Sequence, residues 1–307
     1  MAGNCRGDRL VSSSVQPVLP PDFPPLWAGG WGEDSRGVFA EIVVNGIPIE
    51  MRWIPPGKFP MGSPSGEDGR FDWEGPQHEV TLTRGFWLGS TPFTQAQWEA
   101  VMGKNLSQFK GGDRPVEMVN WENCQEYCEA LNKLLPGLGA RLPTEADWEF
   151  ACRAGTSAFN DGSPCTAPEG ADPALDRLGW YDKNSGGETH PVGQKQANAW
   201  GLYDMHGNVW EWCEDWFGSY PPEAQIDPAG PENGVVRVVR GGSWNNPARS
   251  CRSARRAGFD PGYRFDNLGF RLAAGQELEH EVRGPAAEVT RDAAPKGRTG
   301  HGVRSKT

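Results

Sequence analysis

The chain has 307 residues and a formal net charge of −10, and no stretch of Lys and Arg is dense enough to follow a phosphate backbone. Nucleic acid and an anionic membrane surface are therefore disfavoured as partners. No segment has the length and apolar character of a membrane span, which argues against membrane insertion, and residues 1–16 lack the apolar centre of a secretion signal, so we expect a soluble, cytoplasmic protein.

The composition is that of a loop-rich domain whose core is filled by aromatic side chains. Only 37% of the residues are hydrophobic, while 41 are Gly and 27 are Pro, so much of the chain must form turns and irregular connections. The 14 Trp residues can bury the apolar area that the few aliphatic runs do not supply. Seven scattered cysteines do not form a disulfide framework, and we expect Cys124 and Cys128 to be small buried side chains rather than metal ligands.

The chain begins with a Pro-rich leader, residues 1–36. Its Pro content keeps it out of a central strand, and its Trp and Phe side chains are expected to dock on the domain. A β-hairpin is predicted next, because two apolar runs, 39–44 and 47–54, flank the dipeptide Asn45-Gly46. This dipeptide favours a two-residue hairpin turn.

One further strand and several helices follow in the pattern. Alternation of apolar and polar residues over 79–87 predicts a half-exposed strand. Thr94 and Gln97 resemble a capping box, and Asn120 and Thr144 stand where helix N-caps are expected. The predicted helices run from these caps to residues 102, 135 and about 155.

Residues 155–200 show almost no periodicity, and such a long irregular segment suggests that function or bound ions organise it. After residue 274 the chain is charged and carries no aromatic residue, which predicts a disordered tail over 275–307. The folded domain is therefore assigned to residues 37–274.

The stretch from Arg240 to Leu272 stands out from the rest. Apolar runs at 235–239 and 268–272 bracket a segment rich in Asn, Arg, Gly, Ser and aromatic residues. The segment is too polar to form a core, and it is anchored at both ends. This composition predicts a displayed recognition surface held between two strands.

Four sequence blocks in this order resemble the sulfatase-modifying-factor family, whose founding members are formylglycine-generating enzymes. The blocks are PPGKFPMGS (55–63), RLPTEADWE (141–149), GLYDMHGNVWEW (201–212) and RGGSW (240–244). The resemblance spans residues 53–273. It implies an α+β, C-type-lectin-like fold with short antiparallel sheets, a few helices and much irregular structure.

The resemblance also implies a structural calcium site in the third block. The family's ligand positions fall on the side chains of Asp204 and Glu211 and on the main-chain carbonyls of Gly207 and Val209. The implied set suits calcium, because Ca²⁺ prefers several hard oxygen ligands, and a Gly permits the tight turn that points carbonyls inward. The alternative is that both acids simply lie at a solvated turn, and we favour calcium.

The catalytic pattern of the family is incomplete. The resemblance implies two thiols, five positions apart, that hold Cu(I) and activate oxygen; the match places Asn246 at the first and Cys251 at the second. An amide oxygen is a poor ligand for Cu(I). We therefore expect no copper, no formylglycine-generating activity and a partly buried Cys251. A branch of the family that uses iron held by three His is also disfavoured, since the five His show no helical pair.

A third branch comprises the variable proteins of diversity-generating retroelements, in which the C-terminal strand-loop-strand is a hypervariable ligand surface. This chain is similar to them across residues 244–271. The framework residues that the match retains are Arg240, Gly241, Gly242, Ser243, Trp244, Arg249, Arg252, Leu268, Gly269, Phe270 and Arg271. The candidate diversified, ligand-binding positions are Asn245, Asn246, Pro247, Ser250, Arg255, Ala257, Gly258, Phe259, Tyr263, Phe265, Asp266 and Asn267.

The residues at those positions are compatible with diversification. Randomising the adenines of an AAC or AAT codon cannot produce Trp, Met, Lys, Glu or Gln, and none of these occurs at the candidate positions. Phe259, Tyr263 and Phe265 would be the aromatic anchors of the surface. The opposing interpretation is that these rings belong to the core, but their clustering among Gly and Asn favours exposure.

The sequence thus predicts a non-enzymatic, calcium-stabilised protein that binds a protein or other macromolecular ligand through a variable surface. Two alternatives stay open. One is a copper oxidase of the formylglycine-generating type that works with altered ligands. The other is a structural or regulatory family member without a diversified loop.

Overall fold

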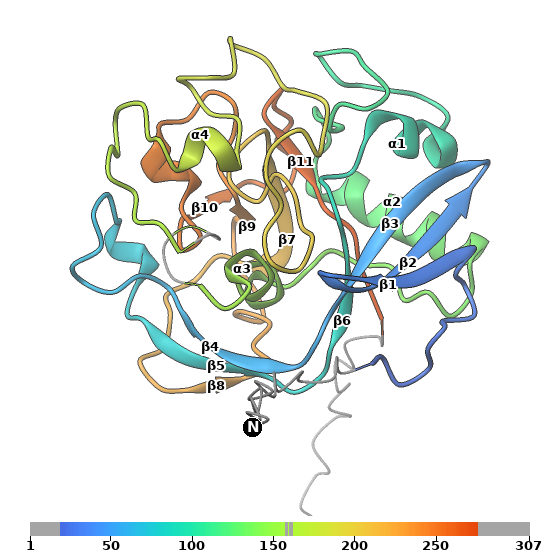
Figure 1. Cartoon of the computed structure of the whole chain (residues 1–307), viewed down its shortest axis with the longest axis horizontal. Helices are drawn as coiled ribbons and strands as arrows, with labels where there is room; N and C mark the ends of the chain where they lie inside the picture. The colour runs from blue at the N-terminus through green and yellow to red at the C-terminus, as the bar shows by residue number, and fades with distance from the viewer. Residues whose placement is uncertain (1–18, 157–158, 160–161, 276–307) are drawn as a thin grey trace, which may run out of the picture. The chain divides into compact units, whose positions relative to one another are not determined.

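The computed structural model describes residues 19–156, 159 and 162–275, which form short strands and helices joined by long irregular segments (Figure 1). The predicted α+β class is confirmed. Apart from Gly275, the predicted disordered tail lies outside the described residues, as do residues 1–18 of the leader.

The first sheet has five antiparallel strands in the order β1-β2-β3-β6-β12. The predicted hairpin forms its centre, and Asn45 and Gly46 take the positive φ angles, 51° and 81°, that the turn requires. Part of the leader adds an edge strand, and its Trp27 ring lies edge-on to Trp87 at 5.5 Å. The strands are β1 (Gly30–Asp34), β2 (Gly37–Val44), β3 (Ile47–Ile54), β6 (Phe86–Gly89) and β12 (Ala273–Ala274).

The second sheet has three strands in the order β4 (Gly57–Met61), β5 (His78–Leu82) and β8 (Gln225–Ile226). The prediction of one strand over 79–87 is wrong, because β5 and β6 belong to different sheets. The chain bends between them at Gly85, where a Cβ atom would lie 2.4 Å from the Trp53 ring and 2.7 Å from the Ile54 carbonyl. Only a residue without a side chain fits there.

The third sheet has the order β10-β9-β7-β11. Its strands are β7 (Trp210–Trp216), β9 (Arg237–Arg240), β10 (Arg256–Phe259) and β11 (Leu268–Phe270). Strand β11 runs parallel to β7, and the other pairs are antiparallel. The segment after Arg240 therefore supplies two strands to this sheet and β12 to the first sheet.

The three predicted N-caps are confirmed. The side chains of Thr94 and Thr144 each accept from a backbone N–H three positions on and complete a capping box, and the Asn120 side chain accepts from Asn123 N–H. A short fourth helix lies in the irregular segment. The helices are α1 (Gln95–Met102), α2 (Trp121–Leu134), α3 (Glu145–Arg153) and α4 (Leu175–Leu178), with 3-10 turns η1 (Asp72–Glu74) and η2 (Ala248–Cys251).

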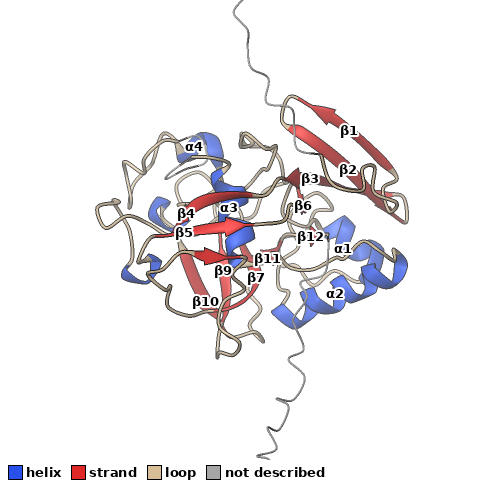
Figure 2. Cartoon of the chain, turned by 90° about the horizontal axis from the view of Figure 1, so that it is seen from below, coloured by secondary structure: helices blue, strands red, loops and turns tan. Residues whose placement is uncertain are grey.

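The helices pack against different strands of the fold (Figure 2). Helix α1 packs against the β2–β3 hairpin and against α2, and α3 contacts β4, β7 and β9. Cys124 and Cys128 are buried in the first of these cores, as predicted. None of the helices formed by the described residues is long and apolar enough to cross a membrane.

Candidate ligand-binding surface

Four buried arginines anchor the segment between β9 and β12. Each guanidinium is fully enclosed and faces a buried glutamate from another part of the chain. The pairs are Arg240 with Glu149, Arg252 with Glu74 (2.7 Å), Arg256 with Glu145 (2.7 Å) and Arg271 with Glu211 (2.9 Å). Removing one member of a buried ion pair leaves an uncompensated charge, so these contacts fix the segment in place.

The sequence predicted only part of this frame of four buried ion pairs. It placed Arg240, Arg252 and Arg271 in the framework but did not single out Arg256, which donates to both carboxylate oxygens of Glu145. The framework residue Arg249 is instead half-exposed and pairs with the exposed Glu169. The partners of a buried pair are 60 to 178 positions apart in the chain, so no local pattern reveals them.

Three aromatic rings gather where the segment reaches the surface. Tyr263 is 51% exposed and Phe265 is 43% exposed. Phe265 lies 5.5 Å from the Tyr263 ring and 5.8 Å from the ring of Phe259. Phe259 is half-buried and rests edge-on to Trp212 in the core. The patch is therefore exposed at its outer end and attached to the core at its inner end.

Polar side chains continue the surface next to these rings. The Ser243 hydroxyl lies 2.9 Å from Asn245 Oδ1 and 2.6 Å from Asn246 Oδ1. The Asn267 amide donates to Asn245 Oδ1 and to the same hydroxyl. Asp266 is half-buried beside them. We call the exposed and half-exposed set the C-terminal surface: Asn245, Asn246, Phe259, Tyr263, Phe265, Asp266 and Asn267.

The remaining candidate positions lie outside these two groups of side chains, although Pro247, Arg255, Ala257 and Gly258 are also partly exposed. Ser250 is buried, which corrects its assignment as a ligand contact. Gly258 has no room for a side chain, because a Cβ atom would lie 2.7 Å from Val236. Its neighbour Ala257 is half-buried on β10, and Pro247 precedes η2. The Arg255 guanidinium is packed over the Phe71 ring at 4.1 Å.

Cys251, expected to be partly buried, is fully buried. It lies in a small apolar cluster with Cys165 and Ala248, and burial raises the pKa of its thiol well above the usual range. A thiol in this setting is a poor source of thiolate. Asn246, at the other position of the expected thiol pair, directs its amide oxygen to Ser243.

The residues of the implied calcium site include one buried oxygen that is not satisfied. Asp204 is buried; its Oδ2 accepts from Gly193 N, whereas its Oδ1 has no hydrogen-bond partner among the described residues. Burial raises the pKa of Asp204 to about 6. At Gly207 (φ +126°) a Cβ atom would lie 2.2 Å from the Trp180 carbonyl, so only Gly permits this turn.

The Glu211 carboxylate accepts more hydrogen bonds than that of Asp204. Its Oε2 accepts from Trp148 and from Arg271 Nε, and its Oε1 accepts from Arg271 Nη2. A carboxylate oxygen has two lone pairs, so Oε1 can still contact a cation. The part of the chain that the structure describes contains no group of three or more His, Cys, Asp or Glu side chains suited to a metal. The donor set fits Ca²⁺ only if the carbonyls of Gly207 and Val209 complete it.

The domain is similar to a known protein family and to a solved structure. A family model described as "Sulfatase-modifying factor enzyme 1-like domain" matches residues 43–276. The solved structure of Treponema denticola variable protein 1 is similar with a TM-score of 0.67 and 31% identity, covering 77% of this chain and 98% of that chain.

Two curated relatives carry different names. Formylglycine-generating enzyme of Mus musculus is 34% identical over 208 residues, covering 64% of this chain and 53% of the mouse protein. Chaperone protein LppX of Paenibacillus barcinonensis is 33% identical over 230 residues, covering 59% of this chain and 76% of that protein. The chain thus spans about half the length of the mouse enzyme.

Proposed function

The chain belongs to the family of sulfatase-modifying factor enzyme 1-like domains, with their C-type-lectin-like fold, and from this premise we propose that it is a binding protein and not an enzyme. The C-terminal surface would contact a protein or other macromolecular ligand. We further propose that this surface is the hypervariable region of a diversity-generating retroelement variable protein.

The observation that carries the proposal is the contrast between the anchored arginines and the exposed rings. Arg240, Arg256 and Arg271 are fully buried in ion pairs, while Tyr263 and Phe265 at the C-terminal surface are half-exposed. A fixed backbone reduces the entropy lost on binding. Exposed aromatic rings attached to a rigid base are typical anchors of protein interfaces.

The comparisons add support of a different kind. The solved relative that is named a variable protein matches this chain along 98% of its own length. The seven residues of the C-terminal surface all belong to the set that randomised AAC and AAT codons can produce. Both observations are compatible with diversification at the same positions that the structure exposes.

The DNA beside the gene tests the retroelement part of the proposal. We expect a near-copy of the codons for residues 244–271 that differs mainly at adenines, next to a reverse transcriptase gene. Sequencing of independent isolates should then find differences at the codons of the C-terminal surface and none at Arg240, Arg256 or Arg271. Absence of a template copy would leave a family member with a fixed surface.

The alternative of a copper oxidase rests on the relatives named as formylglycine-generating enzymes. It is tested by Cu(I) titration and by oxygen uptake in the presence of a cysteine-containing peptide. We expect neither copper-dependent uptake nor conversion of the peptide. The Asn246→Cys variant, which supplies the missing thiol, is the matched comparison. Turnover by the unmodified chain that Cys251→Ser abolishes would overturn the proposal.

We also propose that a calcium ion stabilises the turn before β7. The support is twofold: the buried Oδ1 atom of Asp204 has no hydrogen-bond partner among the described residues, and Glu211 Oε1 keeps a free lone pair. Bound there, the ion would balance negative charge that is otherwise buried and hold the turn rigid. The role that we propose for the calcium ion is structural and not catalytic.

A further inference from the structure

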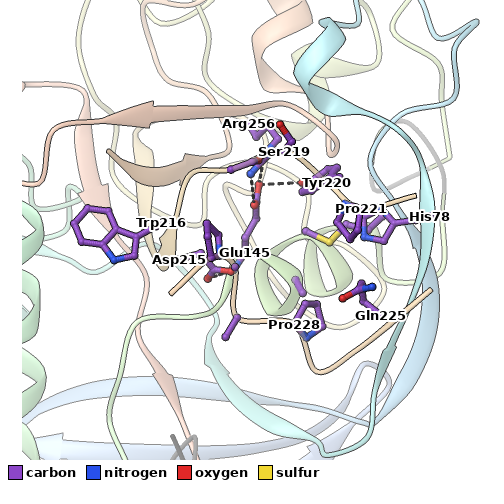
Figure 3. A pocket seen from close by; sticks show the side chains of 16 residues that line it. His78, Glu145, Asp215, Trp216, Ser219, Tyr220, Pro221, Gln225, Pro228 and Arg256 are labelled. Carbon is purple, nitrogen blue, oxygen red and sulfur yellow. Dashed lines mark hydrogen bonds and ion pairs between the residues drawn. The ribbon is translucent and has the colours of Figure 1, made fainter. Parts of the chain in front are cut away.

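A cavity of about 490 Å³ lies beside the start of α3, the end of β7 and the irregular segment 218–231 (Figure 3). This volume is within the range of small-molecule sites. No residue of the C-terminal surface lines the cavity. Arg256 on β10 links the two regions, because it lines the cavity and also belongs to the frame of buried ion pairs.

The inner end of the cavity holds a satisfied ion pair. Arg256 Nε and Nη2 donate to the two carboxylate oxygens of Glu145, both at 2.7 Å. The Tyr220 hydroxyl donates to the same carboxylate at 3.0 Å, and Arg256 Nη1 donates to the Gly218 carbonyl. Arg240 Nε also lies 3.7 Å from Glu145 Oε1, so this carboxylate is fully compensated and does not itself call for a charged ligand.

A second carboxyl group in the cavity is not satisfied in this way. Asp215 is only 4% exposed, and its Oδ2 accepts one hydrogen bond, from the backbone N–H of Glu145 at 2.8 Å. Burial, followed by the neighbouring carboxylates of Glu145, Asp147 and Glu214, raises the pKa of Asp215 well above its usual range. Among the described residues, no ion pair is formed by Asp215, which lines the cavity (Figure 3).

The nearby arginine that could balance Asp215 has other contacts. Arg237 is stacked between the rings of Trp121 (3.9 Å) and Trp216 (3.6 Å) and donates to the carbonyl of Glu214. It therefore flanks the carboxylates without pairing with Asp215. An ionised Asp215 without a counter-ion of its own favours a cationic ligand and opposes a carboxylate or phosphate.

The rest of the lining combines apolar residues with the polar side chains of His78, Ser219 and Gln225. Pro221, Pro228 and Pro231 line the cavity, together with Met61 and Trp216. Proline rings and the indole offer rigid apolar area without donors that need satisfying. A ligand that fits these walls has a compact hydrocarbon ring or chain next to one polar group.

We propose that this cavity binds a small organic cation, in which an ammonium group donates to Asp215 and a compact apolar body lies against the proline walls. A cation supplies the counter-charge that Asp215 lacks among the described residues. It also stabilises the ionised form of this aspartate. None of the residues that line the cavity belongs to the C-terminal surface. It would remain if that surface proved to be invariant.

Titration calorimetry of the full chain with two matched pairs of probes tests the proposal. Benzylamine and cyclohexylamine carry the ammonium group, and benzyl alcohol and cyclohexanol replace it by a hydroxyl. We expect saturable binding of an amine that is at least about tenfold tighter than binding of its alcohol, as for a charge-assisted hydrogen bond. Equal affinity, or no saturable amine binding at millimolar concentration, overturns the proposal.

Variants locate the binding. Asp215→Asn keeps an oxygen for the Glu145 N–H and removes the charge, so amine affinity should fall about tenfold. Glu232→Gln removes one charge from an exposed position outside the cavity and should leave affinity unchanged. Ser219→Trp, at an exposed lining position, should block the cavity if Asp215→Asn fails to fold. Amine binding that survives Ser219→Trp unchanged would place the site elsewhere and overturn the proposal.

Discussion

Arg271 and Glu211 face each other as a fork against a fork, with 2.9 Å between Nη2 and Oε1 and 3.0 Å between Nε and Oε2. Both side chains are fully buried. The remaining N–H groups of the guanidinium donate to the carbonyls of Gly89 and Tyr203. This single residue therefore joins the end of β11 to β7 and to β6.

Replacing Arg271 by Met should lower the free energy of unfolding by about 3–5 kcal/mol, because Glu211 is left buried without its counter-charge. Urea denaturation followed by circular dichroism measures the change. Lys58→Met is the matched control. It breaks the exposed pair with Glu79 and should change stability by less than about 1 kcal/mol. Similar effects of the two variants would contradict the anchoring role of Arg271.

Tyr263→Ala and Phe265→Ala should each change the unfolding free energy by less than about 1 kcal/mol, because both rings are about half exposed and lie outside the core. Phe270→Ala, at a fully buried ring only a few positions away, should lower it by about 3–5 kcal/mol. Chemical denaturation of the three variants gives the comparison. A loss at Tyr263 as large as that at Phe270 would mean that the rings serve the core and not a ligand.

Glu117 should make stability fall as the pH rises through the weakly acidic range. It is buried, its Oε1 accepts from Phe109 N, and its Oε2 has no hydrogen-bond partner among the described residues. Burial raises its pKa from 4.5 to about 7, with Asp266 adding to the rise and Lys110 opposing it.

The sign follows from proton binding by Glu117. Between pH 4.5 and about 7 the folded chain keeps a proton that the unfolded chain releases, so increasing pH favours unfolding. Glu117→Gln should remove this part of the pH dependence, with little effect near pH 4 and a gain in stability near pH 8. Urea midpoints of both proteins, measured at pH 4 and pH 8, show whether Glu117 causes this pH dependence. If the stability of the variant depends on pH as strongly as that of the unmodified chain, Glu117 is not the cause.

Calcium should raise the melting temperature, and a chelator should lower it. A ligand that binds only the folded state at about 100 times its Kd stabilises it by about 2.7 kcal/mol. Differential scanning calorimetry with calcium and with a chelator measures the shift. Asp204→Ala should abolish the shift, whereas Asp204→Asn, which keeps a side-chain oxygen, should retain part of it. An unmodified chain that melts at the same temperature in both conditions would have no structural calcium.

Local signals in the sequence predicted the elements that they control directly. Asn45-Gly46 determines its own turn, and Thr94 and Asn120 bond to backbone N–H groups three positions away. The strand expected over 79–87 failed because the bend at Gly85 is imposed by the Trp53 ring and the Ile54 carbonyl, contacts that alternation cannot report.

The candidate binding residues also differ in how far the local sequence predicts them. Exposure of Tyr263 and Phe265 was expected from their polar, Gly-rich neighbours, and the structure places both rings at the surface. Burial of Ser250 was not expected, because its neighbours in the sequence have the same polar character as the exposed positions. The cavity at Asp215 combines residues from separate parts of the chain, and no motif marks it in the sequence.

Strands β11 and β12 come at the end of the domain and complete two different sheets. Translation that stops within the C-terminal surface would release a chain without Arg271 and without both strands, leaving the edges of β6 and β7 unpaired. Such a product exposes aggregation-prone backbone and is removed by cellular proteases. Both sheets can therefore close only after this segment has been synthesised, which makes folding of the whole domain depend on its last two strands.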